Sequence, residues 1–368
     1  MDYGYGISRK NKWESIMKNI KLNNAIEIAG IDLNNDDDAE ALGHTVASQC
    51  VVLVKDSVAE PRLQQICKLW GQPSTEIVTN YILEKRLTGR HWRNHILNLR
   101  YITKPFQNRF KDNLDYARAN SDNTHGMTRV SFDKDKKTNR PLGLFTSGKL
   151  DWHSDQFAFW ESQRVIALMS LYGTKNSQTT FLCTADAYSK LNHEDKTMVD
   201  ELVCVYEWDG GTMCDDLDKN QMDLVKYNQL PLDGMESPLK DQTASGVEGI
   251  KFPCHSFSKF KGMGTSESYK FRKYLWSKLD KPEYVYRHHW EDGQIMFMDQ
   301  SITLHARPTD VQAGNKRTLV RMVTYMDKLY PETGKPRDTI LWNNKNIPHE
   351  EFAKLVDQKK LQDHNETI

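Results

Sequence analysis

The sequence contains no Cys-x-x-Cys pair, no long apolar run and no net charge. Its six cysteines are scattered, which argues against a zinc knuckle or a disulfide framework. Lys+Arg and Asp+Glu both number 50, so a general attraction to nucleic acid or to an anionic membrane is not indicated. No apolar run approaches the ~20 residues that span a bilayer, and the first residues lack a hydrophobic signal core. We therefore expect a reduced, cytoplasmic protein without a membrane or nucleic-acid partner.

The chain of 368 residues is long enough for one large domain or two small ones. Apolar periodicity predicts strands at 25–33, 51–54, 124–131, 164–172, 293–299 and 317–325. It predicts helices at 39–48, 61–70, 185–191 and 266–279, with Asp38 as the N-cap of the first. Residues 205–265 have no clear period, which predicts a loop-rich insertion of the kind that covers active sites. We expect an N-terminal arm at 1–18, a main domain at 19–330 and a polar extension at 331–368.

The segment Leu150–Phe157, with the sequence LDWHSDQF, carries the first candidate site. His153 and Asp155 lie two residues apart, so on an extended strand both side chains point to one face. An imidazole and a carboxylate on one face supply two ligands for a divalent metal. A further histidine completes the two-histidine, one-carboxylate face of non-haem Fe(II) oxygenases.

A His-x-acid pair is weak evidence alone, because four other pairs of this kind occur in the chain. They are His193 with Asp195, His289 with Glu291, His349 with Glu351, and His364 with Glu366. Such pairs are usually solvated polar faces or structural histidines. The pair at His153 differs because apolar segments flank it, Pro141–Phe145 before and Val165–Met169 after.

His305, which follows the apolar strand that ends at Asp299, is the candidate third ligand. Further along, Arg317 and Arg321 lie on one face of an otherwise apolar strand. Burying two arginines is costly unless anions pair with them, and guanidinium groups bind carboxylates in bidentate fashion. This pattern suits a dicarboxylate cosubstrate, to which a hydroxyl of the segment Gln178–Phe181 could add a hydrogen bond.

Taken in order, these features resemble the taurine dioxygenase (TauD/TfdA-like) family of Fe(II)- and 2-oxoglutarate-dependent oxygenases. The resemblance extends from about residue 25 to residue 325. It rests on Ile28–Leu33, Val51–Lys55, Trp152–Asp155, Thr179–Phe181, Ala187–Tyr188 with Leu191, Asp299–His305, and the pair Arg317 and Arg321. One departure is visible, because the family's His-Pro-x-Thr-Gly stretch is poorly matched around Pro253–Ser258.

The resemblance implies a fold that is mainly β with flanking helices, a double-stranded β-helix of the jelly-roll or cupin-like type. It implies that His153, Asp155 and His305 bind Fe(II), and that Arg317 and Thr179 hold the distal carboxylate of 2-oxoglutarate. Arg321 matches a second family arginine, near the other carboxylate or the substrate. The implied reaction uses dioxygen to decarboxylate 2-oxoglutarate to succinate, coupled to hydroxylation or a related C–H oxidation of a small molecule. Asp155 favours this outcome over halogenation, because related halogenases lack the metal carboxylate.

Two other functions remain open at this point. A zinc-type hydrolase could use the same three ligands, but it leaves Arg317, Arg321 and Thr179 without roles. A non-catalytic jelly-roll binding protein would be supported by the loss of a ligand, and none of the three is lost.

The substrate itself is not readable from the sequence, because resemblance of fold does not choose a substrate. Trp152, Gln156 and Phe157 flank the ligands and are candidates for the substrate pocket, although ordinary packing explains them nearly as well. Residues 85–111 are unusually basic. They are either a solvated helix face or part of the site's mouth, where they would attract an anionic substrate. The sequence leaves open whether the protein is a homo-oligomer.

Overall fold

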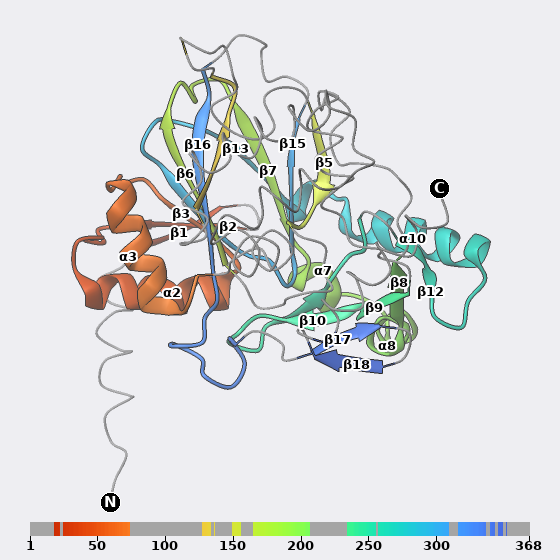
Figure 1. Cartoon of the computed structure of the whole chain (residues 1–368). Coiled ribbons are helices and arrows are strands. Elements are labelled where there is room, and N and C mark those ends of the chain that lie inside the picture. Colours follow the sequence, from red (N-terminus) through yellow and green to blue (C-terminus); the bar gives the residue numbers. More distant parts are fainter. Residues whose placement is uncertain are drawn as a thin grey trace, which may run out of the picture.

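The computed structural model describes residues 18–22, 25–73, 127–133, 136, 149–155, 165–206, 234–254, 257–308, 316–335, 339–342, 345–348 and 351. Two facing β-sheets form the centre of this part of the chain (Figure 1). The large sheet has the strand order β1-β2-β3-β14-β6-β16-β4, and only its β2–β3 pair is parallel. Its strands are β1 (Lys18–Leu22), β2 (Ala25–Ala29), β3 (Val51–Val54), β14 (Ile295–Asp299), β6 (Val165–Tyr172), β16 (Thr318–Thr324) and β4 (Met127–Ser131).

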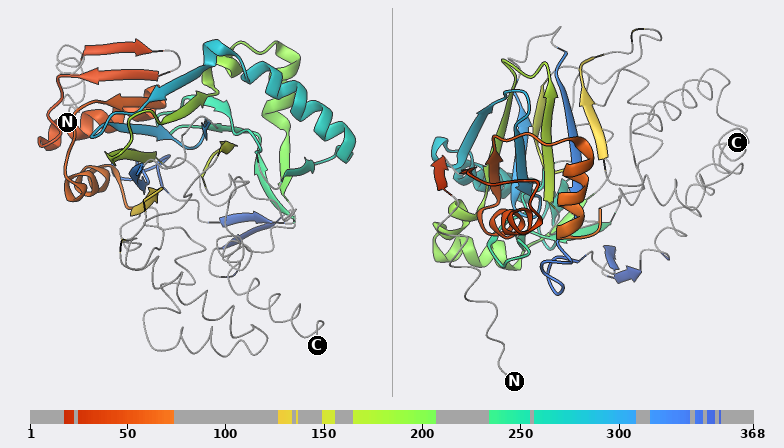
Figure 2. Two further views of the ribbon diagram at one scale, coloured as in Figure 1. Left: turned by 90° about the horizontal axis from the view of Figure 1, so that it is seen from above. Right: turned by 90° about the vertical axis from the view of Figure 1, so that its left-hand side faces the viewer.

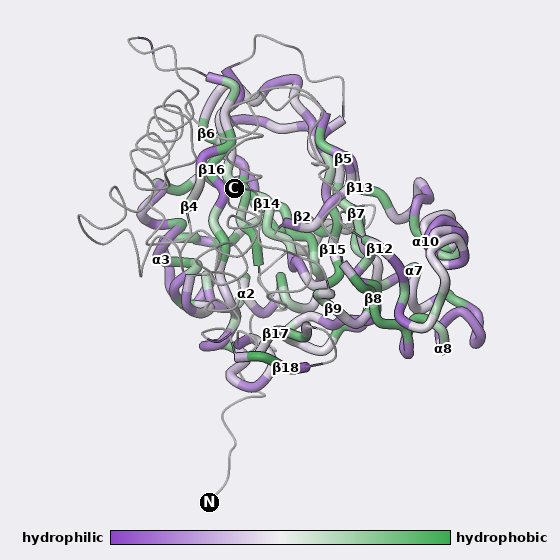
Figure 3. The backbone as a smooth tube through the Cα atoms, turned by 45° about the vertical axis from the view of Figure 1, so that its right-hand side comes forward, coloured by the Kyte–Doolittle hydropathy of each residue, from purple (hydrophilic) through white to green (hydrophobic). Residues whose placement is uncertain are grey.

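The small sheet is antiparallel and has the order β13-β7-β15-β5. Its strands are β13 (Val285–His289), β7 (Gln178–Cys183), β15 (Thr303–Arg307) and β5 (Leu150–His153). Figure 3 shows these four strands on one side of the barrel, opposite β6, β14 and β16. Apolar side chains from both sheets fill the space between them, including Phe181, Met296 and Leu319. Burying such surface is the main favourable contribution to folding, so this shared core holds the two sheets face to face.

Two amphipathic helices cover the outer face of the large sheet, as the right-hand view of Figure 2 shows. They are α2 (Asp36–Gln49) and α3 (Glu60–Trp70). The predicted ends of α3 are confirmed, with a proline in its first turn and Gly71 at its C-cap. Trp70 is fully buried at the end of α3, and its indole N–H donates to the carbonyl of Ala39 at 2.7 Å. This bond fastens one helix to the other.

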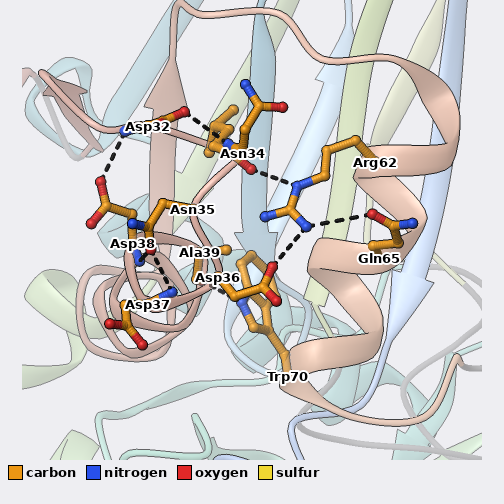
Figure 4. A network of polar contacts seen from close by, with 11 residues as sticks. Asp32, Asn34, Asn35, Asp36, Asp37, Asp38, Ala39, Arg62, Gln65 and Trp70 are labelled. Carbon is orange, nitrogen blue, oxygen red and sulfur yellow. Dashed lines mark hydrogen bonds and ion pairs between the residues drawn. The ribbon is translucent and has the colours of Figure 1, made fainter.

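The prediction that Asp38 caps α2 is wrong, because Asn35 is the N-cap. Its Oδ1 accepts from the backbone N–H groups of Asp37 at 2.8 Å and Asp38 at 3.3 Å (Figure 4). The carboxylate of Asp38 instead accepts from the backbone N–H of Asp32 at 2.9 Å. Five capping candidates follow one another at 34–38, so composition alone does not choose between them.

Replacing Asn35 by alanine should lower the free energy of unfolding by about 1 kcal/mol, because two N–H groups at the start of α2 lose their acceptor. Urea denaturation measures this change. The matched control is Glu40→Ala, an exposed position of the same helix, which should change stability by less than about 0.5 kcal/mol. Equal effects of the two substitutions would mean that Asn35 does not stabilise the helix as a cap.

A third layer packs outside the small sheet and corrects the expectation for residues 205–265. Their described part forms strands rather than loops, and these join β8 and two late strands in a sheet of order β12-β8-β9-β17-β18, beside the pair β10-β11. The strands are β8 (Val203–Tyr206), β9 (Met235–Pro238), β10 (Lys240–Gln242), β11 (Glu248–Ile250), β12 (Phe257–Phe260), β17 (Thr339–Trp342) and β18 (Lys345–Pro348). The last two belong to the expected polar extension, whose Ile347 and Trp342 pack into a core with Met235.

Helices complete this third layer: α7 (Ala185–Ser189), α8 (His193–Glu201) and α10 (Thr265–Leu279), followed by the short 3₁₀ helix η2 (Pro282–Tyr284). Leu275 and Leu279 of α10 are fully buried in the same core as Phe260 of β12. The layer packs against the outer face of the small sheet, and that sheet also carries apolar core residues such as Phe181 and buried polar ones such as His305. In the described part of the chain, no helix combines the length and the apolar character needed to cross a bilayer.

Candidate metal and cosubstrate site

Two histidines face each other on neighbouring strands of the small sheet. His305 of β15 lies directly opposite His153 of β5 in the strand register, and the centres of their rings are 4.2 Å apart. The sequence had suggested that His305 lies beyond the end of a strand. It lies instead in the middle of β15. Nδ1 of His153 lies 2.6 Å from the carbonyl oxygen of Asp151. Because a carbonyl only accepts, Nδ1 carries the proton, and the lone pair of Nε2 is left for a metal.

Asp155 reaches the two imidazoles from a turn, not from the strand itself. β5 ends at His153, so the expectation that both side chains share one face of an extended strand is wrong for Asp155. Its Oδ1 lies 3.4 Å from Nε2 of His153 and 3.7 Å from Nε2 of His305. The turn nevertheless brings the carboxylate close to both imidazoles.

Two side chains from the second half of the chain hold Asp155. The side-chain oxygen of Gln300 accepts from its backbone N–H at 2.7 Å, and Nε of Arg321 donates to its Oδ2 at 2.5 Å. Arg321 therefore lies against the ligand carboxylate, and the sequence did not foresee this contact. Burial works to raise the pKa of Asp155, but the Arg321 guanidinium and the two imidazoles together lower this pKa well below its usual range. The carboxylate is consequently ionised at neutral pH.

The donor set fits a divalent metal. The three candidate ligand atoms all lie within 4.8 Å of one another. In an octahedral site with bonds of about 2.1 Å, neighbouring ligand atoms are about 3 Å apart, so a metal would need only a small contraction. Burial, and then the neighbouring His153, lower the pKa of His305 to about 3, which keeps this imidazole neutral as a metal ligand must be. Nδ1 of His305 is buried, and no described residue accepts from it.

A buried arginine directly before strand β16 contacts two hydroxyl groups of the small-sheet side. Arg317 is 3 % exposed, and its Nε donates to Oγ of Ser177 at 3.2 Å while one Nη lies 3.4 Å from Oγ1 of Thr179. Its other Nη is buried and has no hydrogen-bond partner among the described residues. Burial, and then the positive charge of Arg307, lower the pKa of Arg317 to about 9. A buried cation with an unused donor is a binding site for an anion.

The sequence analysis missed three residues around Arg317, namely Arg307, Ser177 and Phe132. The guanidinium carbons of Arg307 and Arg317 lie 4.7 Å and 5.7 Å from the centre of the Phe132 ring. Arg307 stands two residues after His305, so strand alternation could have placed it on the inner face. Ser177 and Phe132 gave no such signal, because their roles depend on pairing between distant strands.

The three residues expected to form the substrate pocket fare differently. Trp152 lies on the other side of β5 from His153, with its ring centre 6.1 Å from that of Trp276 in the outer core. This placement is against a direct substrate contact, and it follows from strand alternation. Gln156 and Phe157 lie outside the described residues, as does the basic stretch 85–111.

Replacing Gln300 by alanine should weaken Fe(II) binding about 10- to 100-fold, the range typical of groups that hold metal ligands in place. The substitution removes the acceptor for the Asp155 N–H and frees the turn that carries the carboxylate. Gln300→Glu retains an acceptor oxygen and should stay closer to the wild type. Anaerobic calorimetric titration with Fe(II) measures both affinities. Wild-type affinity in the alanine variant would show that the contact does not position Asp155.

A jelly-roll barrel with two histidines and one carboxylate at a common point defines the mononuclear non-haem oxygenase class. Residues 19–323 match the family described as taurine catabolism dioxygenase TauD, TfdA family, and the chain belongs to this family. As a member of this family the protein is an enzyme, a 2-oxoglutarate-dependent dioxygenase that uses Fe(II), 2-oxoglutarate and dioxygen.

Solved structures of similar proteins agree with this fold. A taurine dioxygenase from Burkholderia xenovorans is 17 % identical, with a TM-score of 0.56 over 90 % of this chain and 95 % of that one. The enzyme AAD-2, solved in complex with Mn(II) and N-oxalylglycine, is 15 % identical, with a TM-score of 0.54 over 84 % and 96 % of the two chains. The predicted double-stranded β-helix is confirmed.

Among curated proteins, an alkylsulfatase from Acinetobacter baylyi is 23 % identical over 179 residues. This match spans 47 % of the chain described here and 55 % of the alkylsulfatase, so the chain matches about half the length of that relative.

Proposed function

We propose that this dioxygenase couples the decarboxylation of 2-oxoglutarate to the hydroxylation, or a related C–H oxidation, of a small anionic molecule. His153, Asp155 and His305 are the proposed Fe(II) ligands, and Arg317 with Thr179 is the proposed clamp for the distal carboxylate of 2-oxoglutarate. One observation carries this assignment: the buried Arg317, with an unused donor, lies in the same barrel as the three converging ligand atoms. A zinc hydrolase would leave that arginine without a partner.

The strand register indicates that the distance between the proposed metal ligands and the proposed carboxylate clamp matches the length of 2-oxoglutarate. His305 lies opposite Phe181 of β7, and Thr179 precedes Phe181 by two residues on the same strand. Two residues of a strand span about 7 Å, and their side chains point to one face. This separation suits a five-carbon diacid whose keto-acid end is at the metal and whose other carboxylate is at Arg317.

Each residue has a distinct task in this proposal. Bound Fe(II) would supply the activation of dioxygen, for which the three protein ligands leave open positions. His153 and His305 contribute neutral Nε2 donors, and Asp155 contributes the single negative charge. Arg321 keeps that carboxylate ionised and oriented through its bond to Oδ2. Arg321 also puts a positive charge next to the proposed metal ligands. The family resemblance implied a place for this arginine near the other carboxylate of 2-oxoglutarate or the substrate.

The charge balance of the described site favours an anionic substrate. The charges of Asp155 and Arg321 offset each other, while Arg317 is buried as a cation. A divalent metal and a dianionic cosubstrate would cancel each other, so these groups together keep a net positive charge. The field of that charge favours an anionic substrate even with the Arg317 guanidinium paired to the cosubstrate. The names of two relatives refer to taurine and to alkyl sulfates, which carry anionic sulfur–oxygen groups. Gln156 and Phe157, directly after Asp155, remain proposed substrate contacts.

Two experiments test the proposal in sequence. Anaerobic addition of Fe(II) and then 2-oxoglutarate should produce the visible charge-transfer band of the chelate. A folded, metal-loaded protein without the band would contradict the cosubstrate assignment and favour hydrolytic or non-catalytic alternatives.

With the band established, succinate release is measured with small sulfonates, alkyl sulfates, carboxylates and uncharged analogues of the same carbon skeletons. Anionic compounds should raise succinate release above the rate without substrate, and uncharged analogues should not. Equal stimulation by uncharged analogues would contradict the anionic preference. The Asp155→Ala variant gives the background rate.

A further inference from the structure

Trp290 touches the proposed carboxylate clamp, although nothing in the sequence motif points to it. It follows β13 directly and is 1 % exposed, in the core between the two sheets. Its indole N–H donates to Oγ1 of Thr179 at 2.8 Å, and its backbone N–H donates to the carbonyl of Ser177 at 3.0 Å. Thr179 and Ser177 are the two hydroxyl residues that contact Arg317. One tryptophan therefore holds both of them.

The turn that carries Ser177 and leads into the strand of Thr179 is fastened by the same segment of the chain. Asp292, two residues after Trp290, accepts from the backbone N–H of Thr174 at 3.0 Å and from its hydroxyl at 2.6 Å. Gly173 adopts a φ of +68°, and a Cβ there would lie 2.8 Å from the carbonyl of Lys316, so this position requires glycine. The β6–β7 turn is thus rigid where it meets the residue before Arg317.

The hydrogen-bond capacity of a hydroxyl gives this arrangement a direction. A threonine hydroxyl has one hydrogen to donate and two lone pairs that accept. Oγ1 of Thr179 accepts from Trp290 at 2.8 Å and lies 3.4 Å from an Nη of Arg317, which together occupy both lone pairs. Its hydrogen then has to point away from both donors, and among the described residues no acceptor for it is recorded. An anion held by Arg317 would supply that acceptor.

We propose that Trp290 is a positioning residue for 2-oxoglutarate: its indole N–H orients the Thr179 hydroxyl so that this group donates to the distal carboxylate. The inference rests on the proposed function, because it presumes that the carboxylate lies at Arg317. Packing supports the fixed orientation of the indole, since the His288 ring contacts it edge-to-face with ring centres 4.6 Å apart. The substitution that isolates the effect is Trp290→Phe, which keeps an aromatic ring and removes the N–H.

Trp290→Phe should raise the dissociation constant for 2-oxoglutarate, measured anaerobically with Fe(II), about tenfold, the loss expected from one misdirected hydrogen bond. The KM for 2-oxoglutarate should rise similarly, whereas kcat at saturating 2-oxoglutarate should change less than about twofold. The matched control is Trp276→Phe, because Trp276 packs against Phe252 in the outer core. This variant should leave the dissociation constant and the KM for 2-oxoglutarate unchanged.

A double-mutant cycle separates positioning from packing. In the Thr179→Val background there is no hydroxyl to orient, so adding Trp290→Phe should weaken binding by less than about twofold more. An undiminished tenfold effect in that background would overturn the proposal, as would wild-type affinity in Trp290→Phe alone. Absence of 2-oxoglutarate binding to the wild type would instead contradict the proposed function itself.

A measurement on folded wild-type protein and Thr179→Val remains if Trp290→Phe does not fold. With ¹⁵N-labelled tryptophan, one of the nine indole N–H signals should move markedly on Thr179→Val, because that N–H loses its acceptor. In the wild type the same signal should shift when N-oxalylglycine is added to the protein loaded with diamagnetic Zn(II). If none of the indole signals responds to both changes, the proposed contact is overturned.

Discussion

Replacing His305 by alanine should lower the affinity for Fe(II) by at least about 100-fold and remove activity that depends on 2-oxoglutarate. The magnitude is a lower bound, because even residues that only support a metal ligand cost 10- to 100-fold when they are removed. His305 shares its site with His153 and Asp155, so one of the three donor atoms, and one of the two nitrogens, is lost. Anaerobic titration with Fe(II), followed by the charge-transfer band with 2-oxoglutarate, measures both consequences.

His193→Ala is the matched control, because His193 also stands two residues before an aspartate. It is exposed at the start of α8 and belongs to none of the described clusters that could hold a metal. Metal affinity and the charge-transfer band should therefore be unchanged in this variant. Retention of the band in His305→Ala would contradict the assignment of this histidine and with it the facial arrangement of ligands.

Replacing Arg317 by methionine should weaken 2-oxoglutarate binding at least about 30-fold, because removing one partner of a buried charge pair costs roughly 2–5 kcal/mol. Fe(II) binding alone should be unaffected. The same change should raise the melting temperature of the ligand-free protein by a few degrees, because the desolvated guanidinium, 3 % exposed, has no anionic partner among the described residues. Calorimetry with and without 2-oxoglutarate measures both effects.

Arg129→Met is the control for the arginine experiment. Arg129 lies on β4, beside β16, but its guanidinium is half-buried and donates to Glu60 at 2.9 Å. Its loss should leave the affinity for 2-oxoglutarate unchanged. Wild-type affinity in Arg317→Met would remove this residue from the cosubstrate site. A lower melting temperature would mean that the ligand-free protein already pairs the guanidinium with an anion.

The sequence was most informative where chemistry and periodicity coincide. His153, Asp155 and His305 were identified because a metal requires those residue types, and the structure brings their ligand atoms together. Arg317 was identified because a charged residue on an apolar strand is costly unless it binds something. The limits of α3 were predictable because its first turn contains a proline and its last residue precedes a glycine.

Other features depend on pairing that a single sequence does not reveal. The strands β9 and β17 are short and contain polar residues, and they pair across about a hundred residues through Trp342 and Met235. The bond between Trp290 and Thr179 likewise requires β13 to pair with β7 in one register. The orientation of Trp152 is different, because strand alternation already placed it opposite to His153. Strand alternation is therefore a better guide to the orientation of Trp152 than its proximity to His153 in the sequence.

The pairing of strands from the two halves of the chain has a consequence for how this molecule can change over evolutionary time. Asp155 contacts Gln300 and Arg321 across 145 and 166 residues. The entropy of closing a loop grows only with the logarithm of its length, by about 0.6 kcal/mol per doubling. Insertions or deletions between β8 and β9 therefore affect the closure of the site very little, provided that β7 and β15 keep their register. The length of the chain there can then change over generations while the iron site is inherited unchanged.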